Sequence, residues 1–154
     1  MDKKTLIHLF IKHFNEFIED IESVFPEDQE ISVLKDFLSL YSMVNKTALI
    51  DIWTSYVSDA YREEIKEKNF NFFIDKDWDH DLRYASNKTI ITEKLSHIKD
   101  CVREMDEDNK TKALKYVENL IKISDLYNQN KSKSKTKEIK IIQNQKNSKN
   151  TYFN

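Results

Sequence analysis

The chain has 154 residues and contains no glycine. Loops that cradle phosphates, dinucleotide-binding turns and nucleophile elbows all use glycine where the backbone takes a positive φ or approaches a ligand closely. The absence of glycine therefore excludes a standard P-loop, a Rossmann fingerprint and a G-x-S-x-G hydrolase. Tight two-residue hairpins also favour glycine, so a sheet-rich fold is disfavoured and a helical fold is expected.

Apolar residues recur at three- and four-residue spacings, the pattern of amphipathic helices. Pro26 is the only proline and ends the first of these stripes. The connection to the second stripe is short, so these two helices are expected to run antiparallel. The spacing predicts an all-α, compact bundle of about five helices within a single domain, residues 1–128, with helices over 6–25, 31–44, 49–65, 87–105 and 114–127.

The third predicted helix is unusually aromatic. Trp53, Tyr56 and Tyr61 recur at helical spacing. Aromatic residues in this pattern are mostly core residues, and a face buried against a partner protein is the alternative. The sequence alone does not locate such a partner surface.

The tripeptide N-K-T occurs at 45–47, 87–89 and 109–111. Each is formally an N-glycosylation acceptor. Each also precedes a periodic apolar run, where asparagine is a favoured N-cap because its side-chain oxygen accepts a backbone N–H. Since no secretory signal precedes them, we interpret these asparagines as helix caps.

The chain is expected to be soluble and intracellular. Its one cysteine, Cys101, permits no internal disulfide, which fits a reducing compartment. The N-terminal apolar run is interrupted by His8, Lys12 and His13, which argues against a signal peptide. No stretch approaches the roughly 18 apolar residues that a membrane span needs.

The composition changes after residue 128. Residues 129–154 carry seven lysines and one glutamate, a net charge of +6, so residues 1–128 carry −8 of the overall −2. Low apolar content predicts that this Lys-rich tail is disordered when alone. Its candidate phosphate-binding residues are Lys131, Lys133, Lys135 and Lys137, with non-specific contacts to nucleic acid. The alternatives are a solubilising terminus, drift in composition from codon bias, and a tail that folds back onto the acidic body.

Four aspartates alternate in the segment FFIDKDWDHDL: Asp75, Asp77, Asp79 and Asp81. An EF-hand loop starting at Asp75 places His80 where the turn needs glycine and Ser86 where a bidentate glutamate belongs. An open Ca²⁺ or Mg²⁺ site is the remaining metal hypothesis. Aspartates that cap helices and form solvated turns are the preferred interpretation, so no metal site is predicted here.

A second group, Glu93, His97 and Cys101, shares one face of the fourth predicted helix, and His and Cys are good zinc ligands. Two strong ligands alone do not make a zinc site, so a buried or boundary cysteine and a surface histidine are expected. The surroundings of Cys101, IKDCVREM, do not favour a reactive thiolate. We therefore predict no catalytic residue, no cofactor and no enzymatic activity.

The strings FNEFIEDIESVFPEDQEI (14–31), WTSYVSDAY (53–61) and FFIDKDWDHDL (72–82) resemble a family of short proteins encoded by large double-stranded DNA viruses of algae and other protists. The resemblance covers residues 10–82. It implies a helical viral protein that acts in the host cytoplasm, the nucleus or the virion. No activity and no site residues come with it.

Together these features predict a non-enzymatic interaction or structural protein with an unidentified protein partner. The alternative is a protein anchored non-specifically to nucleic acid through its basic tail.

Overall fold

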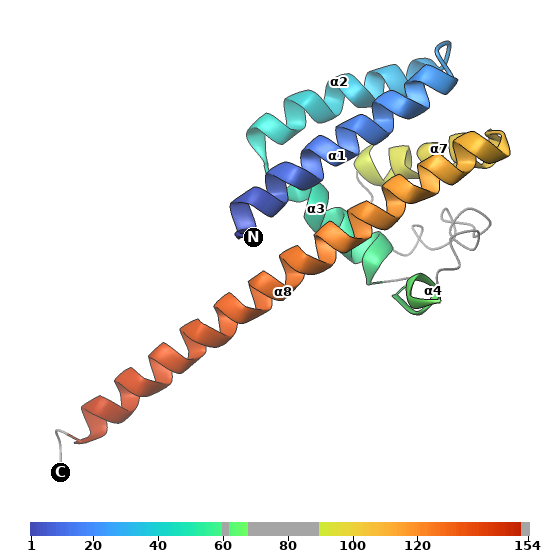
Figure 1. Ribbon diagram of the computed structural model, residues 1–154. Coiled ribbons are helices and arrows are strands. Elements are labelled where there is room, and N and C mark those ends of the chain that lie inside the picture. The colour runs from blue at the N-terminus through green and yellow to red at the C-terminus, as the bar shows by residue number, and fades with distance from the viewer. Residues whose placement is uncertain (60–61, 68–89, 152–154) are drawn as a thin grey trace.

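The computed structural model describes residues 1–59, 62–67 and 90–151, and the regular structure in these ranges is entirely helical (Figure 1). The all-α prediction is confirmed. The elements are α1 (Lys3–Val24), α2 (Gln29–Val44), α3 (Ala48–Trp53), the π-helical turn η1 (Thr54–Ser58), α4 (Arg62–Lys66), α7 (Ile90–Glu104) and α8 (Glu107–Thr151).

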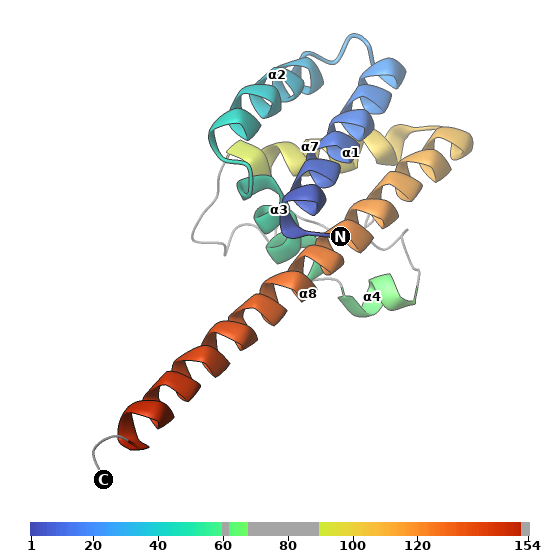
Figure 2. The ribbon, with the colours of Figure 1, turned by 60° about the vertical axis from the view of Figure 1, so that its left-hand side comes forward.

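Helix α1 lies at the centre of the bundle, because it packs against α8, α2, α3 and α7. It runs antiparallel to α2, as expected, and antiparallel to α8 (Figures 1 and 2). Its buried stripe follows the spacing seen in the sequence and consists of Leu6, Phe10, Phe14, Phe17, Ile18 and Ile21. α1 ends at Val24, two residues before Pro26, as the sequence predicts.

The predicted caps have mixed outcomes. Asn45 Oδ1 accepts the backbone N–H of Ala48 at 3.2 Å, so its capping role is confirmed. The prediction for Asn109 is wrong, because Asn109 lies inside α8 and its own N–H is accepted by Asp106 Oδ1 at 2.8 Å. Aspartate is as good an N-cap as asparagine, so the carboxylate three residues earlier takes this position. Asn87 lies outside the described residues.

The prediction of a single regular helix over residues 49–65 is wrong at Thr54–Ser58, where the structure has a π-helical turn. The N–H of Asp59 bonds to the carbonyl of Thr54 at 2.8 Å, five residues back, which widens the helix into a π-turn. Thr54 Oγ1 donates to the carbonyl of Ile50 at 2.8 Å. Such back-bonding by a threonine hydroxyl perturbs helical geometry. The apolar spacing in the sequence does not reveal this π-turn, because the apolar positions before and within it keep nearly the spacing of a regular helix.

The aromatic residues of this run belong to the core where the structure describes them. Trp53 is 4 % exposed, and Tyr56 packs partly buried against the same cluster. Tyr61 lies outside the described residues.

A buried hydroxyl pair joins η1 to α8 and carries a stability prediction. Ser58 Oγ and Ser124 Oγ lie 2.8 Å apart, and Ser124 Oγ also lies 2.8 Å from the carbonyl of Ile121. A hydroxyl has one proton, so when Ser124 donates to Ile121, Ser58 donates to Ser124. Ser124→Ala is expected to lower the free energy of unfolding by about 1–3 kcal/mol, because it removes the hydrogen-bond partner of the buried Ser58 hydroxyl.

Urea denaturation of Ser58→Ala, Ser124→Ala and the double variant measures this coupling. The double variant is expected to be less destabilised than the sum of the two single variants. Strictly additive losses would show that the two hydroxyls do not depend on each other.

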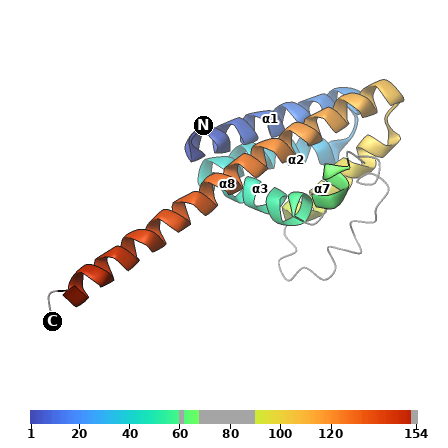
Figure 3. The ribbon, with the colours of Figure 1, turned by 60° about the horizontal axis from the view of Figure 1, so that its bottom comes forward.

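Helix α8 continues far beyond the bundle (Figures 1, 2 and 3). The predicted boundary at 128/129 falls inside α8, and the predicted disorder of residues 129–154 is not confirmed, since residues 129–151 are helical. Lys and Gln are good helix formers, and neither glycine nor proline interrupts the run. None of the described helices combines the length and apolar content needed to cross a membrane.

Candidate functional site

The part of α8 that leaves the bundle is the first candidate site, and we call residues 131–151 the projecting segment. Its base is held by Asn130, whose amide donates to the carbonyl of Met1 at 2.8 Å, and by Lys131, whose Nζ lies 3.9 Å from Asp51 Oδ1. Beyond this base, the described side chains from Thr136 to Asn147 are all exposed. The segment extends about 30 Å, at roughly 1.5 Å per residue.

The helix separates the lysines that the sequence grouped together. Residues on a helix are about 100° apart, so Lys133 and Lys137 share a side, whereas Lys131 points to the opposite side. Lys140 follows at i+3 from Lys137, which gives an exposed stripe of three lysines: Lys133, Lys137 and Lys140. We call these three residues the lysine stripe. Lys135 is on the same helix, and its backbone position lies on the side of Lys131 rather than on the side of the lysine stripe.

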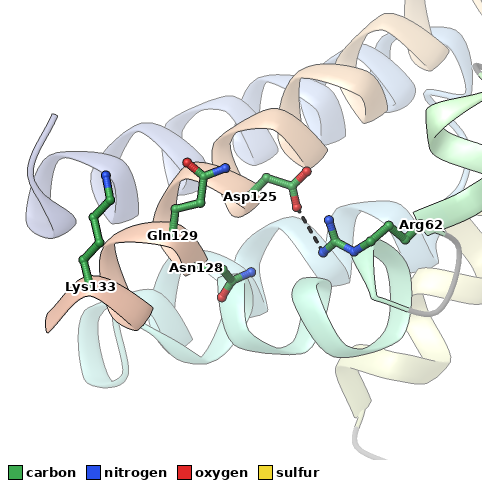
Figure 4. Close-up of a pocket in the computed structure, with 5 residues that line it drawn as sticks. All are labelled: Arg62, Asp125, Asn128, Gln129 and Lys133. Carbon is green, nitrogen blue, oxygen red and sulfur yellow. Dashed lines mark hydrogen bonds and ion pairs between the residues drawn. The ribbon is translucent and has the colours of Figure 1, made fainter. Parts of the chain in front are cut away.

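A pocket of about 470 Å³ adjoins the start of the lysine stripe (Figure 4). It is lined by Arg62 of α4 and by four residues of α8: Asp125, Asn128, Gln129 and Lys133. Arg62 Nη2 lies 3.3 Å from Asp125 Oδ1 and 2.9 Å from Asp59 Oδ1. The hydrogen bond that Arg62 donates to Asp59 raises the pKa of Arg62 further, so this guanidinium stays charged in the pocket that Lys133 also lines.

Three apolar side chains are also exposed on the projecting segment. Ile139, Ile141 and Ile142 are 56 %, 57 % and 52 % exposed. Their angular positions differ, so they do not form the single continuous stripe of a coiled-coil seam.

A group of side chains that could hold a metal ion lies where α2 meets α7, and we call Asp28, His97 and Cys101 the DHC cluster. Asp28 Oδ2 lies 2.8 Å from His97 Nε2. Cys101 Sγ lies 3.6 Å from both of these atoms. Asp28 is the N-cap of α2, and its other oxygen, Oδ1, accepts the N–H of Ile31 at 3.2 Å. The cap therefore brings a carboxylate to the face of α7 that carries His and Cys.

Carboxylates surround this cluster. Glu30 Oε2 lies 3.3 Å from His97 Nδ1, and Lys94 Nζ lies 3.7 Å from the same Glu30 oxygen. Burial opposes ionisation of Asp28, but hydrogen bonds from His97 and from the N–H of Ile31 outweigh it, so the pKa of Asp28 lies below its usual value. Asp28 is accordingly a carboxylate at neutral pH.

The thiol of Cys101 is expected to react slowly. Burial raises the pKa of Cys101 to about 12, with the adjacent Asp28 carboxylate as the next cause. At pH 8 the thiolate fraction should be about a thousandfold lower than for an ordinary cysteine. Ellman's reagent should therefore modify the native chain far more slowly than the urea-unfolded chain, and equal rates would contradict this environment.

The structure brings only some of the metal-ligand candidates from the sequence together. Cys101 is buried at 5 % exposure, as predicted, but His97 is half-buried and paired with carboxylates rather than a free surface residue. Glu93 is exposed, and the cluster's third member is Asp28 instead. The sequence signals that Asp28 begins a helix, but not that this helix start faces α7. The aspartates 75, 77, 79 and 81 lie outside the described residues.

Comparison of the chain with protein-family models, with curated proteins and with solved structures finds no match.

Proposed function

We propose that this chain is a non-enzymatic interaction protein in which the helical body presents the projecting segment of α8 to a partner. The observation that carries the proposal is the exposure of every described side chain from Thr136 to Asn147 on a helix that continues out of the bundle. Most of the stability of a helix in a protein comes from packing one face against another element, and an exposed polar helix lacks that contribution. A surface that packs on this segment would supply that stabilisation.

The partner that its charge favours is a nucleic acid. The projecting segment carries seven lysines and one glutamate, and the lysine stripe continues toward Arg62 at the pocket. Lysines spaced along one side of a helix suit contacts to successive phosphates, which bind without reading bases. The negative charge of residues 1–128 would direct the body away from the same polyanion.

A protein partner is the second candidate, favoured by the exposed isoleucines 139, 141 and 142. Buried in an interface, these side chains would each contribute about 1.5–3 kcal/mol. The resemblance of residues 10–82 to viral proteins supports a viral origin as part of either proposal.

Fluorescence anisotropy of a labelled random-sequence DNA duplex, titrated with the full chain at several salt concentrations, tests the nucleic-acid proposal. We expect binding at low salt, with the logarithm of the affinity falling steeply against the logarithm of the salt concentration. No binding at low salt would reject nucleic acid as the partner. Sedimentation of the full chain would then test self-association through the isoleucines, with Ile142→Lys as the disrupting variant.

A further inference from the structure

We propose that Asp28, His97 and Cys101 bind one Zn²⁺ ion, which would fasten the start of α2 to α7. Three different types of ligand converge here from the start of α2 and from α7. Asp28 and His97 are 69 residues apart in the sequence. None of the three residues belongs to α8, so zinc binding here does not depend on nucleic-acid binding.

The separations of the three donor atoms fit zinc. Bond lengths of about 2.0–2.3 Å in a tetrahedral site place neighbouring ligand atoms about 3.3–3.5 Å apart. The two distances from Cys101 Sγ are 3.6 Å, and the Asp28 to His97 distance is 2.8 Å. The zinc site therefore requires shifts of only a few tenths of an ångström. The mixed thiolate, imidazole and carboxylate set favours Zn²⁺ over Ca²⁺ or Mg²⁺, which take oxygen ligands.

The groups around the three ligands also suit a metal site. A ligating imidazole usually donates its other N–H to a carboxylate, which fixes its tautomer. Glu30 Oε2 occupies this position, 3.3 Å from His97 Nδ1. Asp28 keeps its capping bond through Oδ1 while Oδ2 is directed to the cluster. Carboxylates at Asp100 and Glu104 add negative charge near Cys101.

Binding would exchange protons for the metal in a balanced way. Zn²⁺ takes the sulfur lone pair as the thiol proton leaves to solvent. The proton that His97 Nε2 donates to Asp28 Oδ2 in the metal-free protein must also leave that nitrogen, so that the ring keeps one proton, at Nδ1, and Zn²⁺ takes the Nε2 lone pair. With three protein ligands, the fourth tetrahedral position is left for a water molecule.

Cobalt substitution in the full chain tests the site directly. Co²⁺ added to metal-free protein should produce the near-ultraviolet charge-transfer band of a cobalt thiolate, titrating to one equivalent, and Zn²⁺ should remove it. X-ray absorption of the zinc form should show one sulfur neighbour at about 2.3 Å with nitrogen and oxygen neighbours. Absence of the band, or a zinc shell without sulfur, would overturn the proposal without recourse to any variant.

Variants then assign the ligands. Cys101→Ser should abolish the band, and Glu30→Gln should weaken zinc binding about 10–100-fold by removing the partner of His97 Nδ1. Asp28→Asn should weaken binding more than Glu30→Gln does, yet preserve the α2 cap, since asparagine caps well. Asp106→Asn is the matched control, because Asp106 caps α8 in the same manner outside the cluster. Equal affinity in Asp28→Asn and Asp106→Asn would exclude Asp28 as a ligand.

Discussion

Phe14→Ala is expected to lower the free energy of unfolding by about 3–5 kcal/mol, because it removes a fully buried ring from a close-packed core. Phe14 is 1 % exposed. Its ring centroid lies 6.1 Å from Phe10, 6.4 Å from Phe17 and 5.9 Å from Trp53. Aromatic pairs at these distances stabilise beyond the area they bury, so the cavity and the lost ring contacts act together.

Urea denaturation followed by circular dichroism measures the effect. Leu40→Ala is the matched control, because Leu40 is also apolar but is 69 % exposed on α2. Its loss should stay within about 0.5 kcal/mol, as for most surface substitutions. A loss below about 1 kcal/mol for Phe14→Ala would mean that α1 does not organise the core around this ring.

The core was predictable from sequence because burial imposes a period on the chain. Leu6, Phe10 and Phe14 repeat every four residues, and the buried stripe of α1 follows this spacing. The same reasoning found α2 and α7. It failed at η1, where the Thr54 hydroxyl and a five-residue hydrogen bond change the helix geometry.

The predicted disorder of the end of the chain is likewise not confirmed. Residues 129–151 lack a hydrophobic face, which is typical of disorder, yet they extend a helix that is already nucleated within the bundle. Adding residues to an existing helix avoids the unfavourable nucleation step, so a polar sequence can continue it. The helical geometry in turn decides which lysines share a side.

The DHC cluster shows the limit of spacing arguments. His97 and Cys101 were visible as neighbours because they are four residues apart on one helix. Asp28 lies in the acidic stretch PEDQE that follows the first apolar stripe, and negative charge there suits the N-terminus of a helix. Its approach to α7 results from how α2 and α7 pack, and this contact between distant segments leaves no periodic signal in the sequence.

Replacing the lysine stripe is expected to weaken DNA binding strongly and to change its salt dependence. Each phosphate contact that is lost should flatten the slope of log affinity against log salt by about 0.9, so Lys133→Gln, Lys137→Gln and Lys140→Gln together should flatten it by about three. The reason is geometric: these three exposed side chains lie on one side of α8 and can follow one phosphate strand.

The matched control neutralises three exposed lysines of the body, Lys4, Lys46 and Lys115, and so makes the same change in net charge. If the stripe itself contacts phosphates, the control should keep nearly the wild-type slope of log affinity against log salt, while the stripe variant should show the flattened slope. If both variants lose the same amount, binding follows net charge alone, and the direction in which α8 presents its lysines has no role. Lys131→Gln separates the two sides of the helix further: Lys131 lies across from the stripe and near Asp51, so its loss should change the slope less than the loss of Lys137.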